Sequence, residues 1–199
     1  MKFNRRHFLG GATLVSAGLL SPRAFAAVSS AERPALLPRA MAALNRQHSS
    51  ILHRDLIGIV DFAQPSREQR LQIVDVANGR VAASFLVAHG KGSDPANSGW
   101  ATRFSNRPGS NASCEGSFLT GDVYYGKHGR SRRLEGLDPD NSLALERGIV
   151  IHGAAYVDEA LARSQGRIGR SLGCFAVRQD AVGYLLDRLG PGRLLFVSK

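Results

Sequence analysis

The stretch "GRSLGCFAVR", residues 169–178, places one of the chain's two cysteines on a turn bounded by glycines. A cysteine becomes a nucleophile when a neighbouring group favours its thiolate and takes up the proton, and histidine is the usual neighbour. His152 stands 22 residues before Cys174, at the end of the β-rich segment "IVIHGAAY". A strand, a loop and a returning strand would bring the two side chains together. We therefore expect Cys174 to be a nucleophile and His152 to be its base.

The residues just before Cys174 predict a tight turn. Gly173 frees the backbone for the bend, and the Ser171 hydroxyl is suited to holding it. The backbone N–H groups of Gly173 and Cys174, together with that of Leu172, would then point at one spot. Such a convergence of donors is what an oxyanion hole requires.

Two other interpretations of Cys174 stay open, a buried structural thiol and one half of a disulfide with Cys114. A disulfide is the usual reading of two cysteines in an exported protein, and it needs Cα atoms within roughly 4.4–6.8 Å. We favour Cys114 as a small core residue. A thiol redox protein is a weaker interpretation, because its cysteines normally lie close in sequence and these are 60 residues apart.

His89, His128 and His152 each precede a glycine, which raises the alternative of a metal site. No two of the chain's histidines have the i, i+2 or i, i+4 spacing usual for metal ligands, and the chain has no Cys-x-x-Cys. We expect no metal and no other cofactor. His89 and His128 are expected to be polar loop residues.

The first 26 residues have the pattern of a twin-arginine export signal. Arg5 and Arg6 precede a short apolar run that ends near Leu20, and Ala24-Phe25-Ala26 offers small residues for cleavage. The apolar run is too short for a convincing membrane span, which needs about 20 apolar residues. A retained anchor stays the alternative, but we expect export to the periplasm or cell wall and no stable membrane span after processing.

The rest of the chain is expected to comprise a leader and N-terminal helix over 27–50 and a catalytic domain over 51–199. Removing the signal takes four basic residues from 26 and leaves all 16 acidic ones, so the mature net charge is +6. This charge suits an anionic polymer surface. Export and the lack of a basic stripe with interleaved aromatics argue against nucleic acid as the partner. We expect a monomer.

Hydrophobic patterning predicts a mainly β protein with a helix near each end. The expected elements, in chain order, are a helix to about Gln47, a strand within 56–65, a hairpin about a two-residue turn at Asn78-Gly79, a loop over 90–116, strands within 117–126 and 147–157, a short helix over 158–166, a helix over 178–192 capped by Asp180, and a strand within 193–199.

The order His152-Gly153 followed by Ser171-Leu172-Gly173-Cys174 resembles the catalytic signature of the L,D-transpeptidases, the YkuD-type enzymes of bacterial cell walls. The segments "SCEGSFLT" (113–120), "VANGRVAASFLVAHGKG" and "GPGRLLFV" resemble strands of the same family, and "GKHGRSRRLEGLD" with "IVIHGA" resembles a divergent subgroup of it. The resemblance implies a β-sandwich of the L,D-transpeptidase type, with a peripheral N-terminal helix and a C-terminal helix.

The sequence departs from the family pattern at three positions. Leu172 stands where the family has a histidine, Ala176 where it has an arginine, and Cys114 at its proline position. We expect Arg170 or Arg178 to replace the missing guanidinium.

Gly153 and Tyr124 complete the expected substrate-binding residues. Alternation along a strand places Tyr124 and Tyr125 on opposite faces of it.

The resemblance implies that Cys174 attacks peptidoglycan stem tetrapeptides. The thioester acyl-enzyme would form with release of the terminal D-Ala, and an amine of a second stem would then complete a 3–3 cross-link. Water as the acceptor would make the protein an L,D-carboxypeptidase. A non-catalytic peptidoglycan-binding module with a structural Cys174 is the alternative from another class.

Overall fold

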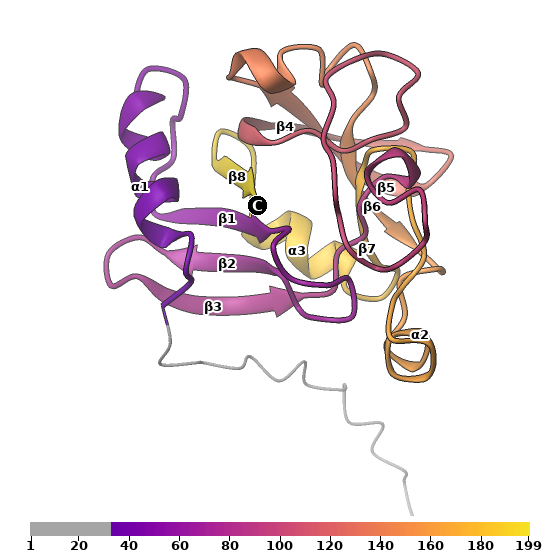
Figure 1. The fold of residues 1–199 in the computed structure, drawn as a ribbon. Coiled ribbons are helices and arrows are strands. Elements are labelled where there is room, and N and C mark those ends of the chain that lie inside the picture. The colour runs from indigo at the N-terminus through magenta and orange to yellow at the C-terminus, as the bar shows by residue number, and fades with distance from the viewer. Residues whose placement is uncertain (1–32) are drawn as a thin grey trace, which may run out of the picture.

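The structure is a computed structural model that describes residues 33–199, so the predicted signal over 1–26 lies outside the described residues. The chain is mainly β, as predicted (Figure 1). The elements are α1 (Leu37–Arg46), β1 (Leu56–Asp61), β2 (Leu71–Asp75), β3 (Arg80–Phe85), the 3₁₀ turn η1 (Lys91–Ser93), β4 (Gly116–Gly126), β5 (Gly129–Gly136), the 3₁₀ turn η2 (Pro139–Asn141), β6 (Val150–Ala154), α2 (Glu159–Gln165), β7 (Phe175–Arg178), α3 (Val182–Arg188) and β8 (Leu194–Ser198).

The strands form one mixed 8-stranded sheet in the order β3-β2-β1-β8-β4-β5-β6-β7. The last strand, β8, lies in the middle, parallel to β1 and antiparallel to β4. The β6–β7 pair at one edge is also parallel, and the remaining neighbours are antiparallel. The sheet bends so that β1, β2 and β3 lie on one side of α3 and β5, β6 and β7 on the other (Figure 1).

The main core lies between these two halves of the sheet. Val60 and Ile73 reach it from one half, Phe118 and Ile151 from the other, and Leu185 from α3. The continuous sheet therefore buries its inner faces against each other and against a helix, in the manner of a sandwich.

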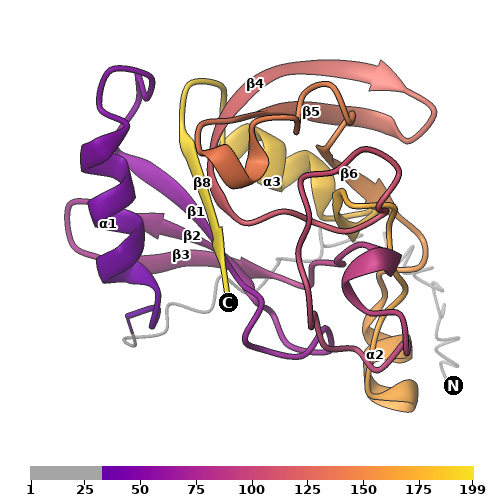
Figure 2. The ribbon, with the colours of Figure 1, turned by 45° about the horizontal axis from the view of Figure 1, so that its top comes forward.

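Helix α1 covers the outer face of the sheet, and Figure 2 shows it standing against β1 and β8. Its buried residues recur at helical spacing, and Leu37, Ala40 and Leu44 pack with Ile57 of β1 and Phe196 of β8. The predicted helix end near Gln47 is confirmed, because α1 ends at Arg46.

The predicted two-residue turn at Asn78-Gly79 is wrong in detail. Four residues join β2 to β3, and the Gly79 N–H donates to the Asp75 carbonyl at 2.8 Å. Of the two turn residues, only Gly79 has a positive φ, of 69°. The Asn78 side-chain oxygen accepts a hydrogen bond from the Arg80 N–H at 2.8 Å. The hairpin itself is confirmed.

Strand β5 was not among the predicted elements, since its sequence "GRSRRLEG" is charged rather than apolar. Arg132 on this strand is nevertheless 3% exposed. Its guanidinium donates to the Gly121 and Leu186 carbonyls at 2.5 and 2.7 Å, which compensates for its burial.

Truncating the α1 contact tests this packing. Leu44→Ala should lower the free energy of unfolding by about 2–5 kcal/mol, because Leu44 is fully buried and a cavity would remain. Leu52→Ala is the matched control, since Leu52 is 76% exposed and its loss should change stability by no more than about 0.5 kcal/mol. Urea denaturation of both variants measures the difference, and equal effects would contradict the assigned packing.

Candidate active site

His152 lies on β6, and Cys174 immediately precedes β7, the parallel strand beside it. Ile151 pairs with Phe175 and His152 with Ala176, and the side chains of Ile151 and Phe175 enter the core. His152 and Ala176 therefore point to the opposite face, and Cys174, two residues before Ala176, shares it. The expectation that the sheet brings the two side chains to one face agrees with this register.

The turn before Cys174 requires glycine. Gly173 has a φ of 121°, and a Cβ there would lie 2.9 Å from the Ala112 carbonyl oxygen. The Ser171 hydroxyl accepts the Gly173 N–H at 3.1 Å and donates to the Cys174 carbonyl at 2.7 Å. Ser171 thus holds the turn as expected.

The same hydrogen bonds change the expected oxyanion donors. The Gly173 N–H already donates to the Ser171 hydroxyl, so it is not free to donate a hydrogen bond to an oxyanion. The N–H groups of Leu172 and Cys174 remain the candidates in this turn. The Leu172 side chain is 58% exposed, which leaves the outer side of the turn open.

The Cys174 side chain is held as a thiol. Its Sγ lies 3.5 Å from the Gly148 carbonyl, to which a thiol donates. Burial raises the pKa of Cys174, while the Val150 N–H and the charges of Lys127 and Arg147 oppose that rise.

His152 is held as a neutral imidazole with one nitrogen free. It is 2% exposed, and its Nδ1 lies 2.9 Å from the Gly153 carbonyl, which can only accept. The proton therefore sits on Nδ1, and Nε2 carries the lone pair that a base needs. Burial lowers the pKa of His152, and the neighbouring His128 and Lys127 lower it further, against the Gly153 hydrogen bond.

His128 is a polar loop residue, as expected, and its ring also stacks on that of His152. The His128 and His152 rings are 4.1 Å apart between centroids, with 19° between their planes. His128 follows Lys127 in the turn that joins β4 to β5. A groove of about 430 Å³ opens beside this pair, and Gly153 and Tyr156 also line it.

Three charged or polar side chains, Arg70, His89 and Asp94, form a buried network behind the site, each about 1% exposed. An Arg70 N–H donates to His89 Nδ1 at 2.7 Å, so the His89 proton is on Nε2, which faces Asp94 at 3.3 Å. Arg70 also donates to the Val87 carbonyl and lies 4.7 Å from the Phe62 ring centroid. His89 lies outside the helices and strands, as expected of a loop residue, but its ring is buried and bridges a buried cation and a buried carboxylate.

The pKa values of this network agree with that arrangement. Burial, with the Arg70 charge, lowers the pKa of His89 to about 4, so the imidazole is neutral. Burial also lowers the pKa of Arg70, to about 9, which leaves the guanidinium charged at neutral pH. Burial alone would raise the pKa of Asp94, but hydrogen bonds from Ser98 and Gly99 hold it below its usual range.

Hydrogen bonds of the backbone and of the Ser113 hydroxyl connect the network to the turn that carries Cys174. The His89 carbonyl accepts the Ser171 N–H at 2.9 Å. The next residue, Gly90, donates its N–H to the Ser113 hydroxyl, which in turn donates to the Gly173 carbonyl, both at 3.0 Å. A shift of His89 would therefore move the turn that carries Cys174.

The loop over 90–116 is irregular apart from η1, as predicted, and Asp94 organises its first part. The Asp94 carboxylate accepts the Ser98 and Gly99 N–H groups at 2.8 Å each. Arg170 donates to the Asp94 backbone carbonyl. Arg170 is thus engaged with the loop, which does not fit its expected role as a substrate clamp.

Arg178 is also engaged. Its guanidinium pairs with Glu159 of α2 and, at 2.6 Å, with Asp180. The expectation that Arg178 replaces the family's guanidinium therefore finds no support in its contacts. The predicted cap role of Asp180 is wrong for the same reason, since Ala181 stands at the N-cap of α3 without a side-chain hydrogen bond.

The two other expected substrate-binding residues differ in position. Gly153 is buried and lines the groove, and a Cβ there would lie 2.7 Å from the Gln179 side-chain oxygen, so a larger residue would displace the Gln179 side chain. Tyr124 is half-buried beneath the Arg133 guanidinium at 4.5 Å, whereas Tyr125 is 79% exposed. The predicted separation of these tyrosines is confirmed, and the groove lining does not include Tyr124.

Cys114 is a free thiol in the main core, and Cys174 is also free. Cys114 is fully buried, and burial raises its pKa to about 11. The preferred interpretation of Cys114 as a small core residue is confirmed.

Arg147 was missed by the sequence analysis. It donates to the Ser105 carbonyl at 2.6 Å, to the Ala112 carbonyl at 2.5 Å and to the Ser110 hydroxyl at 3.3 Å, and so fastens the second part of the loop. Its guanidinium also lies 3.3 Å from the Cβ position of Gly173. No local pattern marks this residue, because all its partners are 35 or more residues away.

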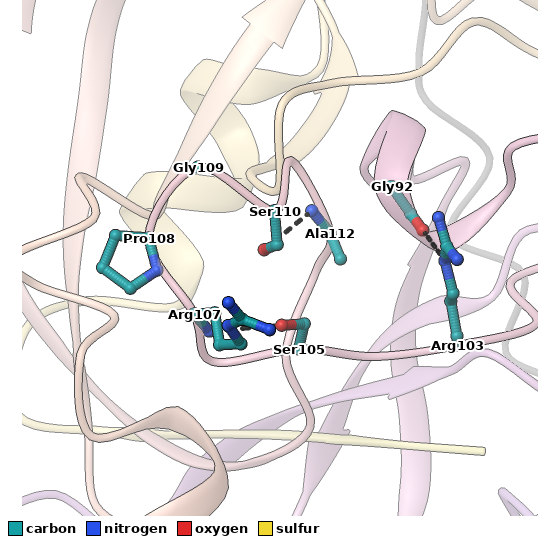
Figure 3. Close-up of a pocket in the computed structure, with 8 residues that line it drawn as sticks. All are labelled: Gly92, Arg103, Ser105, Arg107, Pro108, Gly109, Ser110 and Ala112. Carbon is teal, nitrogen blue, oxygen red and sulfur yellow. Dashed lines mark hydrogen bonds between the residues drawn. The ribbon is translucent and has the colours of Figure 1, made fainter.

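A second pocket, of about 390 Å³, lies within the loop (Figure 3). Arg103 lines it with its Nε donating to the Gly92 carbonyl at 2.7 Å, and Arg107 lies beside Ser105. Ser110 and Ala112 also line this pocket, and the Arg147 guanidinium donates hydrogen bonds to both.

Within residues 33–199, no group of three or more His, Cys, Asp or Glu side chains is placed to hold a metal ion. No helix in the same range is long and apolar enough to cross a membrane.

The buried His89 predicts a pH-dependent stability. Between pH 6.5 and about 4 the unfolded His89 binds a proton and the folded one does not, so the free energy of unfolding falls as the pH is lowered through this window. His89→Gln should cost about 1–3 kcal/mol at pH 7 through its poorer hydrogen bonds. Urea denaturation at several pH values should show the gap between wild type and variant narrowing below pH 6.5, and a constant gap would contradict the assignment.

The protonation of the site predicts how Cys174 reacts. Because burial raises its pKa, alkylation by iodoacetamide should keep accelerating above about pH 8.5, with no plateau below pH 7. Buried Cys114 should stay unlabelled in the folded protein, and Cys174→Ser is the control. Mass spectrometry follows the reaction. A plateau of fast labelling at acidic pH would instead reveal a preformed thiolate–imidazolium pair.

The chain was also compared with known proteins. Among solved structures it resembles an L,D-transpeptidase from Mycobacterium smegmatis (14% identity, 73% of this chain and 59% of that chain, TM-score 0.46). It likewise resembles one from Xylanimonas cellulosilytica (18% identity, 81% and 70%, TM-score 0.45) and the L,D-transpeptidase LdtMt1 in complex with imipenem (16% identity, 72% and 59%, TM-score 0.45). The chain thus spans about three fifths of two of these proteins. The curated proteins contain no match. The model of the L,D-transpeptidase catalytic domain matches residues 29–198, nearly the whole chain, and this protein therefore belongs to the L,D-transpeptidase catalytic domain family.

Proposed function

We propose that this protein is a peptidoglycan L,D-transpeptidase in which Cys174 is the nucleophile and His152 the general base. The observation that supports the proposal most is the register of β6 and β7, which sets His152 opposite Ala176, two residues after Cys174, together with the hydrogen bond of His152 Nδ1 to the Gly153 carbonyl, which leaves Nε2 unprotonated. Cell-wall peptidoglycan is the substrate class that the family implies.

In the acylation step His152 Nε2 takes the proton from the Cys174 thiol as the sulfur attacks a carbonyl carbon. That carbon belongs to the third residue of a stem tetrapeptide. The N–H groups of Leu172 and Cys174 would stabilise the oxyanion that forms. The carbon–nitrogen bond to the terminal D-Ala then breaks, and His152 returns the proton to the leaving nitrogen. The products are a thioester on Cys174 and free D-Ala.

In the second step an amine of another stem attacks the thioester. His152 removes a proton from the amine, and the carbon–sulfur bond breaks with return of a proton to Cys174. The new amide is a 3–3 cross-link between stems. Water in place of the amine would hydrolyse the thioester and give a carboxypeptidase.

The burial of the site suits this order of events. A raised pKa at Cys174 and a lowered pKa at His152 both favour the neutral pair, so charge would develop only as the bond to the substrate forms. A thiol that is largely un-ionised at rest is also oxidised more slowly outside the cell than a thiolate would be.

Localisation is part of the same proposal. The pattern of residues 1–26 would send the folded chain through the twin-arginine route, and a net charge of +6 after cleavage suits attachment to an anionic cell wall. We propose that the mature protein acts there as a monomer.

Product analysis tests the proposal. The purified chain incubated with a disaccharide tetrapeptide should release D-Ala and form cross-linked dimers detectable by mass spectrometry. Cys174→Ser should abolish both products, and His152→Gln should slow them by roughly 100- to 10,000-fold. Cys114→Ala is the matched control and should keep activity, since Cys114 is in the core. Hydrolysed tripeptide without dimers would assign the carboxypeptidase, and wall binding without any product would assign the non-catalytic module.

A further inference from the structure

The groove beside the histidine pair is not used by the mechanism described above. It has a volume of about 430 Å³ and lies between the β4–β5 turn and the end of β6. Lys127 and His128 line one side, and Gly153, Tyr156 and Gln179 line the other. Its lining contains one permanent cation, Lys127, and no acidic side chain.

The groove borders the histidine pair, because two residues that contact the His152 ring, His128 and Gly153, line it. With Nδ1 bound to the Gly153 carbonyl, His152 can pass its proton to the leaving nitrogen only from Nε2. The His128 ring stacks on the His152 ring at 4.1 Å between centroids, and His128 also lines the groove, so the groove lies next to the histidine pair. This step rests on the proposed function, because it takes the leaving group to be an amino acid.

An amino acid leaving group carries a carboxylate two bonds from its nitrogen. When that nitrogen lies at His152, the carboxylate lies within a few ångströms of the same ring, which the groove borders. A cation in that place would both bind the anion and select substrates that possess it.

Lys127 is such a cation. It lines the groove beside His128, and its positive charge lies near enough to affect the pKa values of Cys174, His152 and His128. None of the ion pairs found within residues 33–199 includes Lys127. Arg147, the other cation that acts on Cys174, is bound instead to carbonyl and hydroxyl groups of the loop.

We propose that this groove is the subsite for the terminal carboxylate of the acyl donor, with Lys127 as the residue that binds it. The site would thereby select peptides with a free C-terminus. Lys127 would contribute to donor specificity without taking part in proton transfer.

The test compares two donors that differ only in this group, a stem tetrapeptide and its C-terminal amide. Wild-type protein should acylate from the acid roughly 10- to 100-fold faster in kcat/KM than from the amide, the range for one charge-assisted hydrogen bond. Lys127→Gln should lose most of this preference by slowing the acid alone, and Lys127→Arg should restore most of it.

Lys91→Gln is the matched control. Lys91 is also exposed, and only its backbone bonds to the catalytic turn, through the Ser171 carbonyl. Its loss should leave the ratio between the two donors unchanged. Because Lys127 lies in an exposed turn, its variants should keep the wild-type melting temperature.

Two results would overturn the subsite. Equal rates for acid and amide in the wild type would remove the need for a cation, and an equal slowing of both donors in Lys127→Gln would show a general effect on the thiol. In both cases acylation of Cys174 would persist, so the proposed function would stand. No acyl-enzyme from either donor would overturn the proposed function and the subsite together.

Discussion

The buried contact between Arg70, His89 and Asp94 is the constraint on which the site depends. A charged guanidinium and a carboxylate, each about 1% exposed, are costly to bury unless their hydrogen bonds are satisfied. Here the neutral His89 ring accepts from one and faces the other, and backbone groups satisfy much of the rest. The geometry of this network is therefore tightly specified. Since the His89 backbone binds Ser171, the position of the catalytic turn follows from it.

The surroundings of Cys174 and His152 show a second consequence of burial. Removing both side chains from water disfavours the thiolate of Cys174 and the imidazolium of His152 alike. The nearby positive charges act in opposite senses on these two charged forms. Lys127 favours the thiolate but disfavours a protonated His152. A site of this kind holds a neutral pair at rest and would make its charges during reaction, in the presence of a substrate that compensates them.

The features found from sequence were those carried by short stretches of chain. The turn at Ser171–Cys174 and the helix before Gln47 each depend on residues a few positions apart, so local patterns predict them. The network of Arg70 with His89 and the stacking of His128 on His152 join residues 19 and 24 positions apart in sequence. Polar residues in long-range contacts leave no periodic signal, so the sequence predicts the loop positions of His89 and His128 but not these contacts.

The same distinction applies to the contacts of the two arginines. Arg170 and Arg178 flank the cysteine in sequence, which made them candidates for a substrate clamp, but a guanidinium is long enough to be bound elsewhere. The Arg170 guanidinium donates to the Asp94 carbonyl. The Arg178 guanidinium pairs with two acidic side chains, Glu159 and Asp180. A cation whose charge lowers the pKa of the thiol, Lys127, lies in the β4–β5 turn, 47 residues before Cys174.

Peptide mapping of the trapped intermediate tests most directly whether Cys174 is the acylated residue. After incubation with a tetrapeptide donor and an acid quench, trypsin should release residues 171–178, "SLGCFAVR", separately from residues 104–127, which carry Cys114. The account predicts that the mass of the acyl group appears on 171–178 in wild type and on neither peptide in His152→Gln at early times. An acyl group on 104–127, or on neither peptide in wild type that releases D-Ala, would contradict it.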